Sequence, residues 1–265
     1  MEVSSGDILG LASFPGYTAD TLEEAIQDPD SPMINRALYA YPVGSIFKLV
    51  TAACAKDSEL ADTFQWDCTG TISVEGQLFR CHDDQGHGRQ TMPLAMRNSC
   101  NPFFIQLSQR LSGAALRQTA KALGFGQEIP LTTGQVASSG TLPTLQQLQL
   151  PAERANFGFG QGILTATPLQ ITRMTCAIAG DGTLPEVRLV RGITEDGRNV
   201  LRESSARHSQ GISAETAAYL RSLMCYAAAD SDFAGSHAMS LWVPRPPLPR
   251  PDASARTARR FATAG

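Results

Sequence analysis

The sequence predicts an α+β fold in which an antiparallel sheet is flanked by helices, with an all-helical lobe and an incomplete C-terminal part. Three observations support this fold class. Residues 7–13 have the pattern of a strand, residues 45–123 are dominated by helical patterns, and strands and helices alternate after residue 167. An initial strand and late strands that flank a helical insertion are typical of α+β or three-layer domains.

Each element follows from its local pattern. Helices are predicted over residues 45–56, 92–97, 103–111, 114–123, 167–179 and 213–229. Strands are predicted over residues 7–13, 187–193 and 238–241, and residues 66–90 form a hairpin around Glu75-Gly76. Residues 18–40 form a loop with a short helix, residues 127–150 form a loop, and residues 157–162 form a Gly-rich turn. The helix over 45–56 is apolar nearly all round, which indicates that it is buried in the centre of the domain.

Composition excludes several classes of protein. The net charge is −3, from 22 basic and 25 acidic residues, so we expect no nucleic-acid partner. No apolar run reaches the roughly 18–20 residues of a membrane span, and the first ten residues lack the features of a signal peptide. The strand pattern begins almost at residue 1, which indicates that the chain has been cut out of a longer protein.

The first candidate site is the string Ser45-Ile46-Phe47-Lys48, which fits S-x-x-K. Positions i and i+3 share a face of a helix, so the Lys48 amine can reach the Ser45 hydroxyl. A serine hydroxyl is a weak nucleophile until a neighbouring base removes its proton. Burial on an apolar helix lowers the pKa of a lysine and lets it serve as that base. For an isolated match of this kind, a capping serine and a surface lysine are the favoured interpretation.

The second candidate site is Ser99-Cys100-Asn101, which fits S-x-N. Alone it is typical of a turn between two helices, because Ser, Asn and Pro are favoured there.

Together these strings resemble the transpeptidase domain of penicillin-binding proteins. The resemblance spans about residues 6–242. It is carried by the first-strand string at 6–15, Asn35-Arg36-Ala37, the P-V-G-S-x-x-K string at 42–48, Gly86-His87-Gly88, the Ser99 string, Gly158-Phe159-Gly160-Gln161-Gly162 and Thr167-Pro168-Leu169-Gln170. It implies a penicillin-binding or serine β-lactamase-like fold for a partial transpeptidase domain over residues 1–242.

The resemblance also implies roles for the candidate residues. Ser45 would attack the carbonyl of a D-Ala-D-Ala stem peptide, or of a β-lactam, to form an acyl-enzyme, and Lys48 would accept its proton. Ser99 would relay a proton to the leaving amine, and Asn101 would hydrogen-bond the substrate amide and Lys48. No cofactor and no metal are implied. The implied partners are peptidoglycan stem peptides, β-lactams and a membrane glycosyltransferase, on the extracytoplasmic face of the bacterial membrane.

Residues 243–265 depart from the family pattern. The family's third motif, Lys-Thr-Gly or a close variant, is expected just after Leu241-Trp242 and is not present. Instead the segment contains five Pro and five Arg. Read from the third base of each codon from Val243 onward, it permits Ala-Lys-Thr-Ala-Thr-Ala-Gln-Thr-Gly, close to the family string. We therefore interpret 243–265 as a tail that is frameshifted or disordered, and without the motif the chain is expected to be impaired in activity.

The remaining candidates are less specific. None of the six cysteines forms a C-x-x-C pair, so no zinc site is expected. Cys68 and Cys81 flank the predicted hairpin and either form a disulfide or stay as free thiols. A structural role is favoured for His87 over a general base, and a packing role for Cys100. The alternatives to a transpeptidase are a D,D-carboxypeptidase, a serine β-lactamase, and a module that binds β-lactams without turnover.

Overall fold

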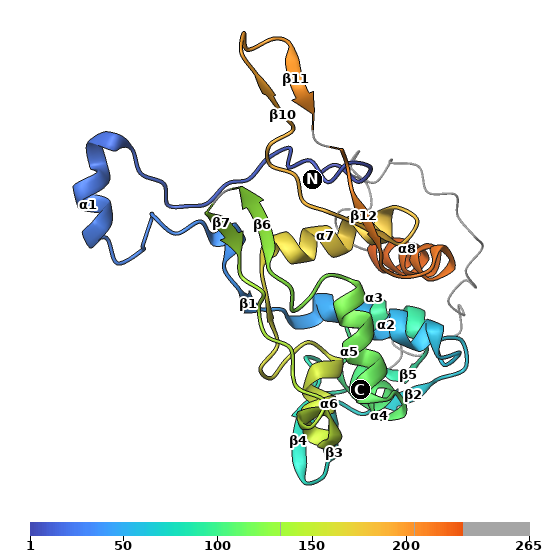
Figure 1. Cartoon of the computed structure of the whole chain (residues 1–265). Coiled ribbons are helices and arrows are strands. Elements are labelled where there is room, and N and C mark those ends of the chain that lie inside the picture. Colours follow the sequence, from blue (N-terminus) through green and yellow to red (C-terminus); the bar gives the residue numbers. More distant parts are fainter. Residues whose placement is uncertain (133, 204, 230–265) are drawn as a thin grey trace.

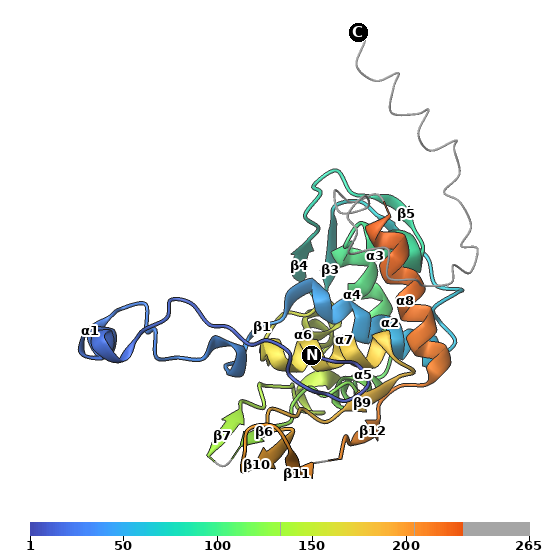
Figure 2. The same cartoon turned by 90° about the horizontal axis from the view of Figure 1, so that it is seen from above.

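The computed structural model describes residues 1–132, 134–203 and 205–229, without the side chains of residues 200–203. Its centre is helix α2 (Lys48–Asp57), around which α4 (Asn101–Arg110), α5 (Gly113–Ala122) and α8 (Ala214–Ala228) pack (Figures 1 and 2). The predicted α+β class and helical lobe are confirmed.

Helix α2 is central because its surface is apolar on almost every side. Seven of its ten residues are buried, and the only charged one among them is Lys48. Phe47, at its N-terminal end, is fully buried and packs against Phe157 and Phe125, with ring centroids 4.7 and 5.4 Å apart. Full burial of such side chains stabilises the domain by about 1.5–3 kcal/mol each, so this helix is held rigidly.

Most of the predicted helices are confirmed. Besides the four helices named above, the described residues form the α-helices α1 (Leu22–Gln27), α3 (Met92–Arg97), α6 (Pro151–Gly158) and α7 (Pro168–Ala179). Helix α7 begins at a capping box, in which Thr167 accepts from the Gln170 N–H and Gln170 accepts from the Thr167 N–H. Ser213 caps α8 by accepting from the Thr216 N–H. Sequence-based prediction missed α6, because its C-terminal end overlaps the Gly-rich string.

The strands among the described residues pair two by two, all antiparallel. The pairs are β1 (Tyr41–Pro42) with β8 (Thr165–Ala166), β2 (Trp66–Cys68) with β5 (Gly88–Gln90), β3 (Thr71–Val74) with β4 (Gln77–Arg80), β6 (Ile129–Thr132) with β7 (Gln135–Ala137), β9 (Thr183–Pro185) with β12 (His208–Gln210), and β10 (Gly192–Thr194) with β11 (Val200–Glu203). The hairpin predicted around residues 75–76 is confirmed. Glu75 and Gly76 have φ of 48° and 84°, the left-handed conformations that a two-residue hairpin turn requires.

Three predictions for the strands and loops were wrong. Residues 7–13 do not form a regular strand: Asp7 makes one isolated parallel bridge to Arg188. The predicted strand over 187–193 is reduced to this bridge and the first residues of β10. Residues 127–150 contain the β6–β7 hairpin and a 3₁₀ turn, Gln147–Gln149, rather than only loop. The predicted strand over 238–241 and the tail over 243–265 lie outside the described residues.

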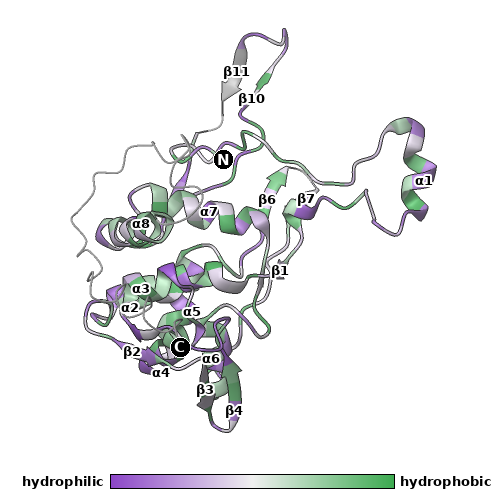
Figure 3. Ribbon diagram, turned by 180° about the vertical axis from the view of Figure 1, so that it is seen from behind, coloured by the Kyte–Doolittle hydropathy of each residue, from purple (hydrophilic) through white to green (hydrophobic). Residues whose placement is uncertain are grey.

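Two arms project from the helical body. The segment that carries α1 extends away from it, and so does the β10–β11 hairpin (Figures 1 and 2). Hydrophobic residues lie along the helices of the body, mixed with hydrophilic ones (Figure 3). Within the part of the chain that is described, no helix is long and apolar enough to cross a bilayer.

Candidate active site

Ser45 lies at the N-terminal end of the central helix. It is part of a 3₁₀ turn, η3 (Gly44–Phe47), that runs directly into α2. Gly44 precedes it with φ of 67°, a left-handed conformation that favours glycine. Ser45 is exposed, whereas Lys48, one turn later, is buried. The nucleophile candidate therefore faces solvent while its neighbouring amine does not.

The Lys48 ammonium lies among four oxygen atoms. Its Nζ is 3.1 Å from Ser45 Oγ, 2.9 Å from Ser99 Oγ, 2.7 Å from the Ser99 carbonyl and 2.8 Å from Asn101 Oδ1. Ser99 Oγ also donates to Ser45 Oγ at 3.0 Å. The structure therefore brings together all four side chains predicted from the two sequence motifs, although 51 residues separate Lys48 from Ser99.

Lys48 Nζ can make three hydrogen bonds in either protonation state, because an ammonium has three donors and a neutral amine has two donors and one lone pair. The Ser99 carbonyl and Asn101 Oδ1 only accept, so each takes a donor of Nζ in both states. The third position is shared by the Ser45 and Ser99 hydroxyls. An ammonium donates to one of these hydroxyls, whereas the lone pair of a neutral amine accepts a proton from one of them. The geometry fits both forms, and in the neutral form it allows Ser45 to transfer its proton to Lys48.

Burial favours the neutral form of the Lys48 amine. Removal from water lowers the pKa of Lys48 to about 8, and the neighbouring Cys100 and Cys81 thiols act in the opposite direction. Nζ also lies 5.6 Å from the centroid of the Phe104 ring. A substantial fraction of neutral amine near physiological pH is what a general base for a serine requires.

Ser99 and Asn101 are fixed by a tight turn between α3 and α4. Ser99 has φ of 47°, a left-handed backbone conformation that is uncommon for a residue with a side chain. Strained backbone conformations of this kind are found at functional sites more often than elsewhere. Asn101 begins α4, and its Nδ2 donates to the Arg80 carbonyl at 3.1 Å. Because Nδ2 is occupied by that carbonyl, Oδ1 is directed to Lys48.

The Gly-rich string braces the turn that carries Ser45. The Gly44 N–H donates to the Gly160 carbonyl at 2.9 Å, and Thr51 Oγ1 donates to the Gly158 carbonyl at 2.7 Å. Gly160 has φ of 88°, and a Cβ at this position would lie 1.9 Å from the Gly44 carbonyl oxygen. Only glycine permits this approach of two backbones. The buried Thr51 was not singled out from the sequence, since a threonine on an apolar helix carries no signal.

A second cluster of reactive side chains lies beside the first. Cys68, Cys81, His87 and Cys100 present ligand-type atoms that all lie within 4.8 Å of one another. All three thiols are free and buried. The sequence left open whether Cys68 and Cys81 form a disulfide or stay as free thiols, and in the structure both are free thiols. Cysteine spacing predicted no such cluster, because its members are spread over three segments that are distant in the sequence.

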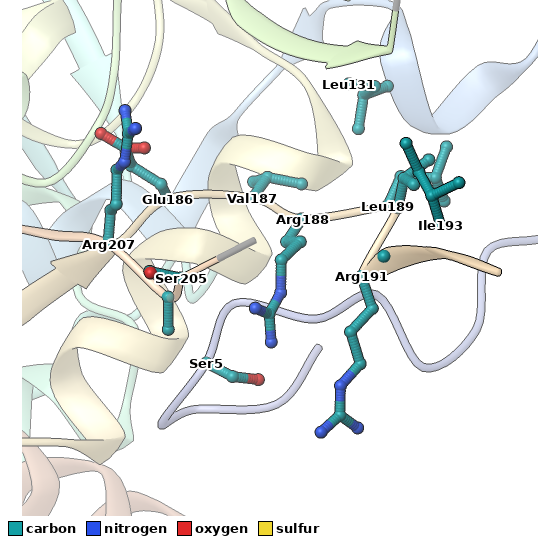
Figure 4. Close-up of a pocket in the computed structure, with 13 residues that line it drawn as sticks. Ser5, Leu131, Glu186, Val187, Arg188, Leu189, Arg191, Ile193, Ser205 and Arg207 are labelled. Carbon is teal, nitrogen blue, oxygen red and sulfur yellow. The ribbon is translucent and has the colours of Figure 1, made fainter. Parts of the chain in front are cut away.

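A further hollow lies beside the N-terminal segment (Figure 4). Its lining includes Ser5, Glu186, Arg188 and Arg207, and it contains none of the predicted site residues. Arg188 there pairs with the Asp7 carboxylate. The hollow is therefore not part of the Ser45 site.

Comparison with protein families agrees with this geometry. The family described as penicillin binding protein transpeptidase domain matches residues 1–241. Stage V sporulation protein D of Bacillus subtilis is 32% identical over 228 residues, which cover 83% of this chain and 34% of that protein. Peptidoglycan D,D-transpeptidase PbpA of Mycobacterium tuberculosis is 30% identical, over 84% of this chain and 49% of that protein. The chain thus spans about a third to a half of the length of these relatives.

Solved structures show the same fold. The penicillin G acyl-enzyme complex of penicillin-binding protein A from M. tuberculosis superposes with a TM-score of 0.77 at 28% identity, over 86% of this chain and 56% of that one. The D,D-transpeptidase domain of a peptidoglycan glycosyltransferase from Eggerthella lenta has a TM-score of 0.79 at 25% identity, over 87% of this chain and 60% of that one. The predicted penicillin-binding fold is confirmed.

Proposed function

Since the chain belongs to the family of penicillin-binding protein transpeptidase domains, we propose that it forms an acyl-enzyme on Ser45 from D-Ala-D-Ala stem peptides in peptidoglycan cross-linking. The single observation that carries the proposal is the buried amine of Lys48, 3.1 Å from the exposed Ser45 hydroxyl. The same attack on a β-lactam ring would give a stable acyl-enzyme.

Acylation begins with transfer of the Ser45 proton to the Lys48 amine. The Ser45 oxygen then forms a bond to the carbonyl carbon, and the carbonyl π electrons move to its oxygen. When this tetrahedral intermediate collapses, the bond to the leaving D-Ala amine breaks. Ser99 Oγ lies within hydrogen-bond distance of both Lys48 and Ser45, so it is placed to return the proton to that amine. Proton and electron pairs balance without a cofactor.

The negative charge that develops on the carbonyl oxygen of the tetrahedral intermediate must be stabilised by hydrogen-bond donors. The Ser45 backbone N–H lies at the N-terminal end of the central helix, where the helix dipole also favours negative charge. In the family resemblance the second donor comes from the strand of the third motif, and no Lys-Thr-Gly string occurs in this chain. Loss of one such donor costs about 100- to 1000-fold in rate, so we expect acylation to be slow but measurable.

The acyl acceptor would be the amine of a second stem peptide. We place the reaction on the extracytoplasmic face of the bacterial membrane, where the relatives' substrate, peptidoglycan, is assembled. A solved structure of a peptidoglycan synthase complex is similar in fold, with a TM-score of 0.74 at 25% identity. This similarity supports a membrane glycosyltransferase as the partner of this protein.

The test is covalent labelling of the chain by a fluorescent penicillin. We expect slow, stoichiometric labelling that Ser45→Ala abolishes and that Ser58→Ala, at an exposed serine beyond the end of α2, leaves unchanged. Absence of labelling of a folded wild-type chain would refute the assignment of Ser45. Rapid release of the label would instead favour a carboxypeptidase or β-lactamase, in which water is the acceptor. Stable labelling with no product from stem peptides would indicate a binding module.

A further inference from the structure

We propose that Cys68, Cys81, His87 and Cys100 bind one zinc ion at a structural site beside the acylation site. This inference goes beyond the acyl-transfer function, which needs no metal. It is carried by the gathering of four side chains that are all zinc ligands and that come from three segments: the end of β2, the loop between β4 and β5, and the start of α4.

The distances fit a tetrahedral metal site. His87 Nδ1 is 3.4 Å from Cys81 Sγ and 3.8 Å from Cys68 Sγ. With zinc–sulfur bonds of about 2.3 Å and zinc–nitrogen bonds of about 2.0 Å, ligand atoms of a regular tetrahedron lie about 3.5–3.8 Å apart. All four ligand atoms lie within 4.8 Å of one another, so small side-chain movements complete the shell.

The loop that carries His87 contributes no apolar side chain of its own to the core, although the neighbouring cysteines lie in the main hydrophobic cluster. Residues 82–88 read His-Asp-Asp-Gln-Gly-His-Gly and contain no aliphatic side chain. Yet the loop is folded tightly against the neighbouring strand: the Cys81 N–H donates to the Gly70 carbonyl at 2.8 Å, and a Cβ on Gly86 would lie 2.2 Å from the Cys68 carbonyl oxygen. A polar loop held this closely needs a source of stability, and a structural metal supplies it in small elements.

The ligand set selects the metal. Three thiolates and one neutral imidazole form a closed four-coordinate set, which is typical of structural zinc. Thiolate ligands disfavour magnesium, calcium and manganese, which prefer oxygen. Because the set is closed, the ion has no open position for substrate or water, and its role is to cross-link the chain.

The cross-link ends inside the acylation site. Cys100 lies between Ser99 and Asn101, and it is fully buried. A second connection runs parallel to it: Gln90 Nε2 donates to the His87 carbonyl at 3.0 Å, and Asn98 Nδ2 donates to Gln90 Oε1 at 3.0 Å. Metal binding would therefore hold the turn in which Ser99 has its left-handed conformation.

A disulfide is the rival occupant of this space. It would join two of the three sulfur atoms at about 2.05 Å and leave the third thiol and the imidazole unused. The convergence of all four groups on one point favours the metal, because a disulfide does not require the histidine.

The test begins with the full chain, purified under reducing conditions without chelators. Elemental analysis is expected to find about one zinc per chain. Replacement by Co²⁺ is expected to give the strong visible bands of tetrahedral cobalt and sulfur-to-cobalt charge-transfer absorption. Cys68→Ser, Cys81→Ser and His87→Gln should each lose most of the metal. His82→Gln, at the exposed neighbouring histidine, and Cys176→Ser, at a buried cysteine elsewhere, should keep it.

A folded wild-type chain without zinc, and without charge-transfer absorption on addition of Co²⁺, would overturn the proposal. So would a disulfide among Cys68, Cys81 and Cys100 found by mass spectrometry of the chain as purified. Should a ligand variant fail to fold, the wild-type chain decides alone through its metal content and the Co²⁺ spectrum. These readouts do not involve acylation, so they stand whether or not Ser45 is labelled by penicillin.

Discussion

The two clusters that meet at the turn over residues 99–101 differ in what holds them together. The Ser45 cluster is assembled by the apolar core, because its lysine is carried on a central helix whose other buried residues are neutral. The cysteine cluster packs against the same core through its three cysteines, but its histidine lies on a polar loop without aliphatic side chains. The first cluster is therefore fixed by apolar packing, whereas the loop of the second is fixed in addition by what its cysteine and histidine side chains bind.

The largest expected effect comes from removing the amine of the first cluster. Lys48→Met keeps much of the volume of the side chain but removes the base, so penicillin acylation should fall by about 100- to 10,000-fold. Lys56→Met, at a lysine that forms surface ion pairs with Asp62 and Glu215, should leave the rate unchanged. Stopped-flow or gel-based labelling measures both rates. A Lys48 variant that acylates at the wild-type rate would remove lysine from the mechanism.

The pH dependence of acylation tests the same amine without mutation. Burial lowers the pKa of Lys48 to about 8, and only the neutral form can accept the Ser45 proton. The rate should therefore rise with pH through about 8 and level off above it. Between pH 6 and pH 8 the neutral fraction, and the rate with it, increases by roughly 50-fold. A flat profile over this range, in a chain that circular dichroism shows to be folded, would contradict the assignment.

The close contact between Gly160 and Gly44, the residue before Ser45, should be the next feature at which a substitution lowers the acylation rate. In Gly160→Ala the new Cβ would lie 1.9 Å from the Gly44 carbonyl oxygen, so the backbone that carries Ser45 must shift. A displacement of about 1 Å at a reacting group can cost about 100-fold in rate.

Gly76→Ala is the matched control, because Gly76 also has a left-handed φ, of 84°, but has open space around its Cβ position. It should cost about 1 kcal/mol of stability and leave acylation unchanged. Equal effects of the two substitutions on acylation would show that backbone strain alone, and not the contact with Gly44, matters.

Cys100→Ser tests how far the two clusters are coupled. Serine is a poor zinc ligand, so the variant should lose metal, and acylation should fall by about tenfold as the turn around Ser99 loosens. Zinc removal from the wild-type chain by a chelator should produce the same loss. If the variant loses zinc and acylates normally, the metal stabilises only the polar loop.

The approach of the Ser45 pair to the Ser99 pair was expected from the family resemblance, whereas no expectation joined the members of the cysteine cluster. Spacing alone gives only the local geometry of each pair: Ser45 and Lys48 are one helical turn apart, and Ser99 and Asn101 lie two positions apart in one turn. The members of the second cluster come from a strand end, two loop positions and the start of α4. Their approach depends on the pairing of β2 with β5, which places Cys68 opposite Gly88. The predicted hairpin around residue 75 was the one signal that brought Cys68 and Cys81 together.

The helices were predicted more successfully than the strands for a related reason. A helix such as α7 is determined by its own residues, including the cap at Thr167. The strand predicted over residues 7–13 needs a partner, and among the described residues it has only the bridge from Asp7 to Arg188. Apolar alternation shows that a segment is able to form a strand, but not that a partner strand lies beside it.

The smallest expected effect separates the metal ligands from their charged neighbours. Asp67 precedes Cys68, and its carboxylate forms a surface ion pair with Arg89 at 3.7 Å, with both side chains about two-thirds exposed. Exposed pairs of this kind contribute about 0.5 kcal/mol or less, because water and salt screen them. Asp67→Asn should therefore keep its zinc, its acylation rate and nearly all of its stability, although it lies one residue from a ligand whose replacement by serine removes the ion. Loss of zinc from Asp67→Asn would mean that the loop is held by charge rather than by the sulfur and nitrogen atoms of the cluster.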